Sequence, residues 1–273
     1  MTKEKKYWRV LTITGDVNQR EIMCSLLDEF SEGIQDFDDS NEIYIEPGNE
    51  SNVESILSKY NLNYSWKNVE QEDWHLAWKD NFIPIEISDK IIIIPDWDEN
   101  QYKHEIVVKI RPGMAFGTGH HETTQLMMEM LLKYAKPEMS FMDAGAGSGI
   151  LSIAAYLLGV KNTTLVEFDI DCESNFYENL ELNGLEGKLK INIADALKWK
   201  DYSQDLILAN INKNVLKELI PKLSNGNGTV ILSGLLDSDE SEMIELCKLN
   251  RLDHVETLQK GEWISIVFKK ENL

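Results

Sequence analysis

The chain of 273 residues is long enough for one large domain, or for one large and one small domain. Its hydrophobic content of 42% is typical of a globular protein with a core and excludes a disordered chain. With a formal charge of −20 it lacks the basic balance that neutralises phosphates, so we expect no direct nucleic-acid partner. The acidity suits a basic protein partner, but from charge alone we favour the alternative that it merely keeps the protein soluble.

The cysteines and the hydropathy of the chain indicate the cellular compartment in which we expect the protein. The three cysteines are far apart and form neither a disulfide framework nor a zinc motif: Cys24, Cys172 and Cys247. Residues 1–8 are charged and carry no apolar signal region. The most apolar long stretch, residues 150–160, is too short to span a bilayer. We therefore expect a cytoplasmic enzyme that does not associate with membranes.

Residues 1–69 contain alternating strand and helix patterns in the order βαββαβ. The predicted elements are a strand at 8–13, a helix at 18–30, strands at 34–37 and 42–45, a helix at 53–60 and a strand at 62–69. Ser51 is the expected N-cap of the second helix. This order predicts a small ferredoxin-like α+β domain over residues 1–69. Because no phosphate loop or metal spacing occurs there, we assign the domain to recognition or packing.

An aromatic stretch follows this first domain. Trp74, Trp78 and Phe82 recur every four residues, which places them on one face of a predicted helix. They either dock that helix on the next domain or contact a substrate. Strands are expected at residues 91–94 and 105–110.

From residue 141 onwards strand and helix patterns alternate. The predicted strands are 141–143, 163–168, 189–193, 206–209, 229–235 and 263–268, and the predicted helices are 150–158, 171–182, 214–223 and 238–249. Asn183-Gly184 is a typical stop for the second of these helices. The alternation predicts a doubly wound, Rossmann-like α/β domain over residues 70–273, with ligands bound at the carboxyl ends of its strands.

The strongest single motif is Asp143-Ala-Gly145-Ala-Gly147-Ser-Gly149, between an apolar strand and an apolar helix. Glycines allow tight turns and a close approach of the backbone to a ligand. A dinucleotide-binding loop has its third glycine where this chain has Ile150, which disfavours a nicotinamide-dependent oxidoreductase. The pattern resembles instead the cofactor loop of class I methyltransferases.

Polar side chains follow the next three predicted strands. Glu167 and Asp169 both lie where a carboxylate can accept ribose hydroxyls, and we choose Glu167. Asp169 otherwise compensates the charge of a helix N-terminus. Asp195 either holds an adenine amino group or is a turn residue. Asn210 either aims its carbonyl at a nucleophilic nitrogen or caps the following helix.

A glycine-rich loop over residues 111–124 precedes a helix expected to begin near Thr124. Such a loop can cover a cofactor as a lid, with Phe116 at its centre. His120, His121 and Glu122 suggest a metal, but the sequence offers no second pair of ligands, so we expect none.

Together these segments resemble the PrmA family of ribosomal protein L11 methyltransferases. The resemblance lies in residues 73–82, 112–124, 143–151, 166–169, 209–211, 233–235 and 262–263. The pairing of Phe116-Gly-Thr-Gly-x-His-x-Thr-Thr with Ala209-Asn-Ile is specific to this family within the wider fold. The chain departs from the family pattern at Glu167, usually aspartate, and at His120 and Glu122, often threonine and proline.

The resemblance implies a seven-stranded class I methyltransferase fold and the cofactor S-adenosylmethionine. It implies cofactor contacts from Thr124, Gly145, Glu167 and Asn210, and methyl transfer to lysine side-chain or N-terminal amino groups of ribosomal protein L11. The N-terminal domain would grip that substrate, and we expect a monomer. The alternatives are a methyltransferase for another protein or a small-molecule amine, and a catalytically silent ribosome-assembly factor.

Overall fold

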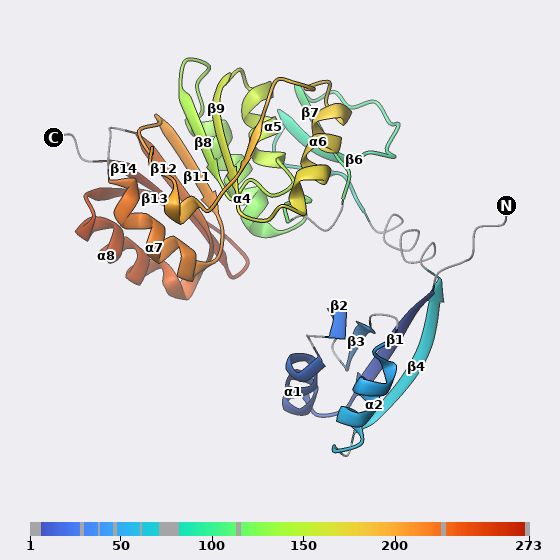
Figure 1. Cartoon of the computed structure of the whole chain (residues 1–273). Coiled ribbons are helices and arrows are strands. Elements are labelled where there is room, and N and C mark those ends of the chain that lie inside the picture. Colours follow the sequence, from blue (N-terminus) through green and yellow to red (C-terminus); the bar gives the residue numbers. More distant parts are fainter. Residues whose placement is uncertain are drawn as a thin grey trace. The chain divides into compact units, whose positions relative to one another are not determined.

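The computed structural model describes residues 7–27, 30–37, 39–45, 48–60, 62–70, 82–112, 116–224 and 228–270. The chain divides into two compact units, Met1–Phe82 and Ile83–Leu273. Among the described residues, the first unit has one sheet and one apolar cluster, whereas the second has two sheets and two apolar clusters. The sheets are shown in Figure 1.

The first unit is a four-stranded antiparallel sheet of order β2-β3-β1-β4 with two helices. Its elements are β1 (Tyr7–Thr14), α1 (Val17–Leu27), β2 (Ser31–Asp36), β3 (Ser40–Ile45), α2 (Glu50–Leu57) and β4 (Asn63–Glu70). Apolar side chains of both helices pack on β1 and β3, among them Met23, Leu27, Val53 and Leu57. The predicted order of elements is therefore observed, although the N-cap of α2 is Asn49 rather than Ser51.

The aromatic helix predicted around Trp74 and Trp78 lies outside the described residues. Phe82, the last residue of that pattern, is described and buried.

The second unit is built on a seven-stranded sheet of order β10-β9-β8-β11-β12-β14-β13. Its strands are β8 (Ser140–Ala144), β9 (Asn162–Glu167), β10 (Ile191–Ile193), β11 (Leu206–Asn210), β12 (Thr229–Leu236), β13 (Leu252–Lys260) and β14 (Trp263–Lys270). The first five run parallel, whereas β14 is antiparallel to both of its neighbours. The sheet is therefore mixed, and the doubly wound expectation holds for its parallel part.

Helices cover both faces of this sheet (Figure 1). One face packs against α4 (Glu122–Tyr134), α5 (Ile150–Leu157) and α6 (Cys172–Leu182), and the other against α7 (Lys213–Leu223) and α8 (Glu240–Leu249). Neighbouring strand residues alternate between the two cores: Phe141 and Leu206 face the first, Met142 and Ile207 the second. Short 3-10 helices η2 (Ala196–Lys198) and η3 (Asp237–Asp239) complete this part. Among the described helices, none is long and apolar enough to cross a membrane.

A smaller sheet of order β5-β6-β7 lies beside α5 and α6. It consists of β5 (Ile85–Glu86), β6 (Ile91–Pro95) and β7 (Ile106–Ile110), and β6 and β7 are parallel. The sequence predicts β6 and β7, because both are runs of β-branched residues, but not the two-residue β5.

Strand β13 is the one element of the seven-stranded sheet that the sequence does not predict. Of its nine residues only Leu252 is buried, since β13 forms the edge of the sheet. A mostly polar edge strand lacks the apolar alternation that identifies strands from sequence.

Candidate functional site

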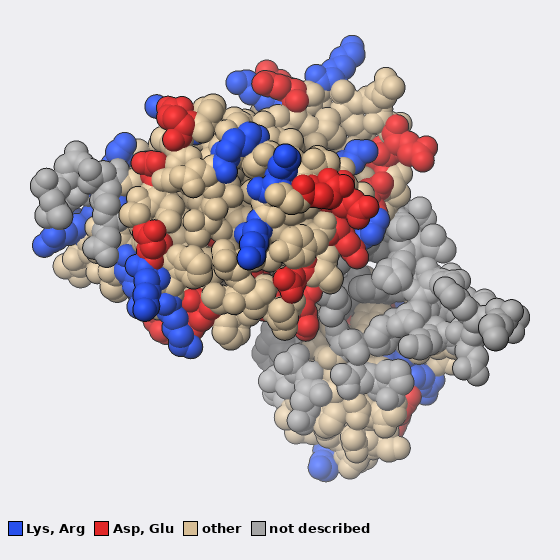
Figure 2. Space-filling view, turned by 45° about the horizontal axis from the view of Figure 1, so that its top comes forward, with Lys and Arg blue, Asp and Glu red and all other residues tan. Residues whose placement is uncertain are grey.

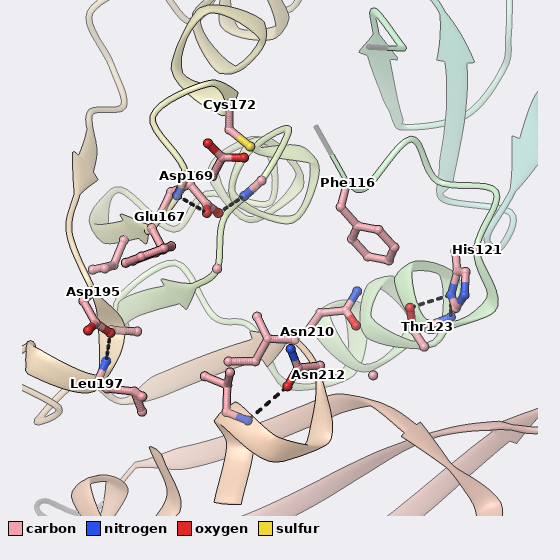
Figure 3. Close-up of a pocket in the computed structure, with 18 of the residues that line it drawn as sticks. Phe116, His121, Thr123, Glu167, Asp169, Cys172, Asp195, Leu197, Asn210 and Asn212 are labelled. Carbon is pink, nitrogen blue, oxygen red and sulfur yellow. Dashed lines mark hydrogen bonds between the residues drawn. The ribbon is translucent and has the colours of Figure 1, made fainter. Parts of the chain in front are cut away.

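A cavity of about 760 Å³ opens at the carboxyl ends of β8, β9 and β11, where the predicted α/β sheet would bind a ligand. Its lining comes from Phe116, His121, Thr123, Gly145, Gly147, Val166, Glu167, Phe168, Asp169, Cys172, Asp195, Ala196, Leu197, Asn210, Ile211, Asn212, Val215, Gly234 and Trp263. Figure 3 shows Glu167, Asp169 and Asp195 on one side, Phe116, His121 and Thr123 on the other, and Asn210 between them.

Gly145 and Gly147 line the cavity on the turn between β8 and α5. Both have positive φ, 88° and 51°, which L side chains rarely adopt. A Cβ on Gly145 would lie 2.4 Å from Cγ2 of Ile211, and one on Gly147 would lie 2.6 Å from the carbonyl oxygen of Phe116. The positive φ agrees with the tight turn that the sequence predicts, and close packing of the chain on itself is a further requirement that the sequence interpretation did not include.

Glu167 is the last residue of β9, and its carboxylate accepts hydrogen bonds from two backbone segments. Its Oε2 accepts from the backbone N–H of Gly147 at 2.8 Å, and its Oε1 accepts from that of Asp169 at 2.9 Å. Asp169 accepts from the backbone N–H of Asp171 at 2.9 Å, just before α6. Both Glu167 and Asp169 line the cavity, so a ligand there can meet either carboxylate.

Asp195 lines the same side of the cavity and is also a turn residue. It is the N-cap of η2, and its Oδ1 accepts from the backbone N–H of Leu197 at 2.8 Å. This backbone hydrogen bond, together with Lys198, holds the pKa of Asp195 below its usual value. The carboxylate is therefore ionised at neutral pH and has further acceptor capacity toward the cavity.

Asn210 is the last residue of β11 and is 9% exposed. Its Oδ1 is buried and has no hydrogen-bond partner in the described part of the chain. The capping alternative is wrong, because α7 is capped by Asn212, whose Oδ1 accepts from the backbone N–H of Val215 at 3.1 Å. Asn210 lines the cavity, so its Oδ1 atom is available there as a hydrogen-bond acceptor.

Three of the predicted site residues lie behind the cavity wall and are not among its lining residues: Thr124, Asp143 and Gly149. Asp143 is fully buried, its Oδ2 accepts from the Ser152 hydroxyl at 2.6 Å, and burial raises its pKa to about 7. Thr124 is fully buried on α4, and Gly149 precedes α5 as its N-cap, where a Cβ would meet the ring of Phe176.

Aromatic rings form the wall near Asn210. Phe116 is 55% exposed and its ring centroid lies 5.6 Å from that of His121, which in turn lies 4.6 Å from that of Trp263. His121 is fixed as the N-cap of α4, where its ring nitrogen accepts from the backbone N–H of Thr123. Within the described residues no group of His, Cys, Asp or Glu could hold a metal ion.

Several other lining residues were not predicted to belong to this site, among them His121, Phe168, Cys172 and Trp263. Phe168 is 75% exposed. Its position directly after Glu167 in the sequence could have identified it as a residue of the site. Trp263 lies in a segment that resembles the family, but its place in the cavity depends on β14 returning beside β12.

The lining suits S-adenosylmethionine. Carboxylates at the ends of β9 and β10 can accept hydroxyl and amino donors, and they favour a cationic ligand. The unpartnered Asn210 oxygen offers an acceptor deeper in the site, beside aromatic rings that receive apolar and cationic groups.

Comparisons with known proteins identify the family of the chain. The family described as ribosomal protein L11 methyltransferase (PrmA) matches residues 10–271. Two curated relatives named ribosomal protein L11 methyltransferase come from Ruminiclostridium cellulolyticum and Prochlorococcus marinus. The first is 35% identical to this chain, and the match covers 89% of this chain and 82% of the relative. The second is 32% identical, and the match covers 98% of this chain and 99% of the relative.

A crystal structure of ribosomal protein L11 methylase from Lactobacillus delbrueckii subsp. bulgaricus superposes with a TM-score of 0.65 at 31% identity. The match covers 70% of this chain and all of that one. The chain therefore belongs to the ribosomal protein L11 methyltransferase (PrmA) family, whose members are S-adenosylmethionine-dependent protein methyltransferases.

Proposed function

We propose that this enzyme transfers methyl groups from S-adenosylmethionine to lysine side-chain amino groups, N-terminal amino groups or both on ribosomal protein L11. The observation that carries the proposal is the Oδ1 atom of Asn210, buried in the cavity wall without a partner in the described residues. A buried acceptor left unsatisfied costs about 1–3 kcal/mol, so the site favours a ligand that donates an N–H. A substrate amine is such a donor.

The cofactor end of the site is formed by acidic side chains. Glu167 would accept the ribose hydroxyls, and Asp195 would accept from the adenine amino group. Gly145 and Gly147 form the floor, and Asp143, Thr124 and Gly149 support it from behind the lining. When bound, the cofactor supplies a methyl carbon on a sulfonium, which an amine can attack directly.

The amine must be neutral before it can attack. For a lysine with the ordinary pKa near 10.4, losing the proton at pH 7 costs roughly 4–5 kcal/mol. Burial in an apolar pocket lowers the pKa of an ammonium, so part of this cost falls on substrate binding. The Asn210 oxygen accepts one amine N–H and aims the lone pair, while the Phe116 ring excludes water. No dedicated carboxylate base is needed.

The first unit supports a separate role in substrate recognition. Its βαββαβ order and its antiparallel sheet order β2-β3-β1-β4 match a ferredoxin-like domain, to which we assign residues 1–69. Residues 70–273 then form the methyltransferase domain. The net charge of −20 suits a basic protein substrate in the cytoplasm, and the enzyme acts as a monomer.

The acidic side chains do not form one continuous patch on the face of the second unit shown in Figure 2, where acidic and basic groups are interspersed. The net charge would therefore steer the approach of the substrate, and local contacts would select it.

The test is intact-protein mass spectrometry of unmethylated L11 after incubation with the enzyme and S-adenosylmethionine. Mass gains in methyl steps that require the cofactor are expected. Asn210→Ala, at equal concentration, should give almost none. If the wild-type enzyme binds the cofactor but adds no mass to L11, the substrate assignment is wrong, and labelled cofactor in cell extracts would then identify the true acceptor.

A further inference from the structure

Ser148 joins the lid segment (residues 116–119) to the cofactor loop (residues 143–149). It lies between Gly147 and Gly149 and is buried. Its backbone N–H donates to the carbonyl oxygen of Phe116 at 3.0 Å, and its hydroxyl donates to that of Gly117 at 2.6 Å. Two successive lid carbonyls are thus held by one residue of the cofactor loop.

Asn179 of α6 holds Ser148 from the other side. Its Nδ2 donates to the carbonyl oxygen of Ser148 at 2.9 Å, and its Oδ1 accepts from the backbone N–H of Arg111 at 2.7 Å. The side chain is fully buried. Asn179 therefore connects the cofactor loop to the end of β7, from which the chain leads into the lid.

Asn179 belongs to a row of asparagines spaced four residues apart along α6 and its C-cap. Asn183 pairs with Lys109, donating to its carbonyl oxygen at 2.7 Å and accepting from its N–H at 2.9 Å. Asn175 donates to the carbonyl oxygen of Arg111 at 2.9 Å. The row docks α6 on the backbone of β7 and its end, but only Asn179 also reaches the cofactor loop.

The lid segment and the cofactor loop pack so closely that neither Gly147 nor Gly117 has room for a side chain. A Cβ on Gly147 would lie 2.6 Å from the carbonyl oxygen of Phe116, and one on Gly117 would lie 3.0 Å from the hydroxyl of Ser148. Neither Ser148 nor Asn179 lines the cavity, so neither touches a ligand there.

We infer that Ser148 and Asn179 are positioning residues for methyl transfer. They fix the backbone of Phe116 and Gly117 against the cofactor loop, so that the Phe116 ring stands over the cavity near the Asn210 amide (Figure 3). The inference rests on the proposed function of that site, and it adds that the lid and the cofactor loop behave as one unit.

The kinetic test is a double-mutant cycle. Ser148→Ala removes the hydroxyl bond to Gly117 but keeps the backbone bond to Phe116. We expect kcat on L11 to fall about ten-fold and the dissociation constant of S-adenosylmethionine to change less than about two-fold. In a Phe116→Ala background the same change should cost less than about two-fold, because the ring that Ser148 positions is gone. An equal loss in both backgrounds, or a loss explained by weaker cofactor binding, overturns the inference.

A second measurement needs no substrate. Hydrogen exchange of peptides containing residues 116–121 should be faster in Ser148→Ala and Asn179→Ala than in the wild type. Asn183→Ala is the matched control, since it removes the same side chain from the C-cap of the same helix, where that side chain does not bond to Ser148. It should leave these peptides unchanged. Thermal unfolding establishes that each variant is folded.

The two proposals fail separately. If L11 gains no methyl groups but the exchange pattern is as expected, the substrate assignment is wrong and the positioning role stands. If exchange of residues 116–121 is unaltered in Ser148→Ala, the positioning role is wrong whatever the substrate.

Discussion

The backbone N–H of Gly147 donates a 2.8 Å hydrogen bond to the carboxylate of Glu167, which ties the cofactor loop to the end of the neighbouring strand. The other carboxylate oxygen accepts from Asp169, so the orientation of Glu167 is fixed by two backbone donors before any ligand arrives. Such preorganisation lowers the entropy lost when a ligand binds there.

Replacing Glu167 should weaken cofactor binding more than replacing its neighbour. Glu167→Gln removes a charged acceptor, and such hydrogen bonds contribute about 1.5–3 kcal/mol, so we expect the dissociation constant of S-adenosylmethionine to rise roughly 10- to 100-fold. Asp169→Asn should raise it only a few-fold. Isothermal titration calorimetry measures both. A larger effect from Asp169→Asn would transfer the ribose contact to that residue.

Removing the Asn210 amide should affect turnover rather than cofactor affinity. Asn210→Ala loses the acceptor that aims the amine, and we expect kcat on L11 to fall on the order of 100-fold. The dissociation constant of the cofactor should change little. Asn250→Ala is the control, because that amide donates to the carbonyl oxygen of Leu246 at the end of α8 and lies outside the cavity lining. Full turnover by Asn210→Ala would exclude the orienting role.

The buried Asp143 predicts a pH dependence of stability. Burial raises its pKa to about 7, whereas in the unfolded chain an aspartate titrates near 3.9. Between about pH 4 and pH 7 the folded state therefore binds the extra proton, so the free energy of unfolding falls as the pH rises. The loss at Asp143 is on the order of 4 kcal/mol across this window.

Urea unfolding at several pH values tests this prediction. Asp143→Asn, which keeps an acceptor for the Ser152 hydroxyl, should show a flatter decline between about pH 4 and pH 7 than the wild type. The exposed Asp171 provides a control, since Asp171→Asn should leave the profile unchanged. Parallel profiles for wild type and Asp143→Asn would show that Asp143 ionises normally in the folded protein.

The close packing of Gly145 against Ile211, which directly follows β11, predicts that adding one methyl group at Gly145 destabilises the fold. Gly145→Ala places a Cβ at positive φ and 2.4 Å from Cγ2 of Ile211, so it should destabilise the fold by roughly 1–3 kcal/mol. Gly33→Ala, whose Cβ would meet nothing within 4 Å, is the control. Adding Ile211→Ala should restore part of the loss, as measured by urea unfolding. If it restores none, backbone strain rather than the clash accounts for the loss.

Sequence periodicity alone determines much of the second unit. Six of the seven strands of its larger sheet and the helices between them follow from apolar patterns, and Gly184, with φ of 65°, ends α6 as predicted. Such features are local, because propensity and capping act over one or two turns of chain. For the same reason the polar residues after β9, β10 and β11 are identifiable as site candidates from sequence, and all of them line the cavity: Glu167, Asp169, Asp195 and Asn210.

What only the tertiary structure decides is which distant side chains meet. His121 and Trp263 are brought together by an antiparallel β14, and local sequence contains no signal for that strand order. Likewise Asn212, not Asn210, caps α7, and Asp143 lies behind the cavity rather than in it. The coupling of Ser148 to Phe116 joins two loops through backbone carbonyls, which every residue carries. Side-chain patterns therefore specify the elements and their polar ends, while contacts made through the backbone and across the sheet depend on how the elements assemble.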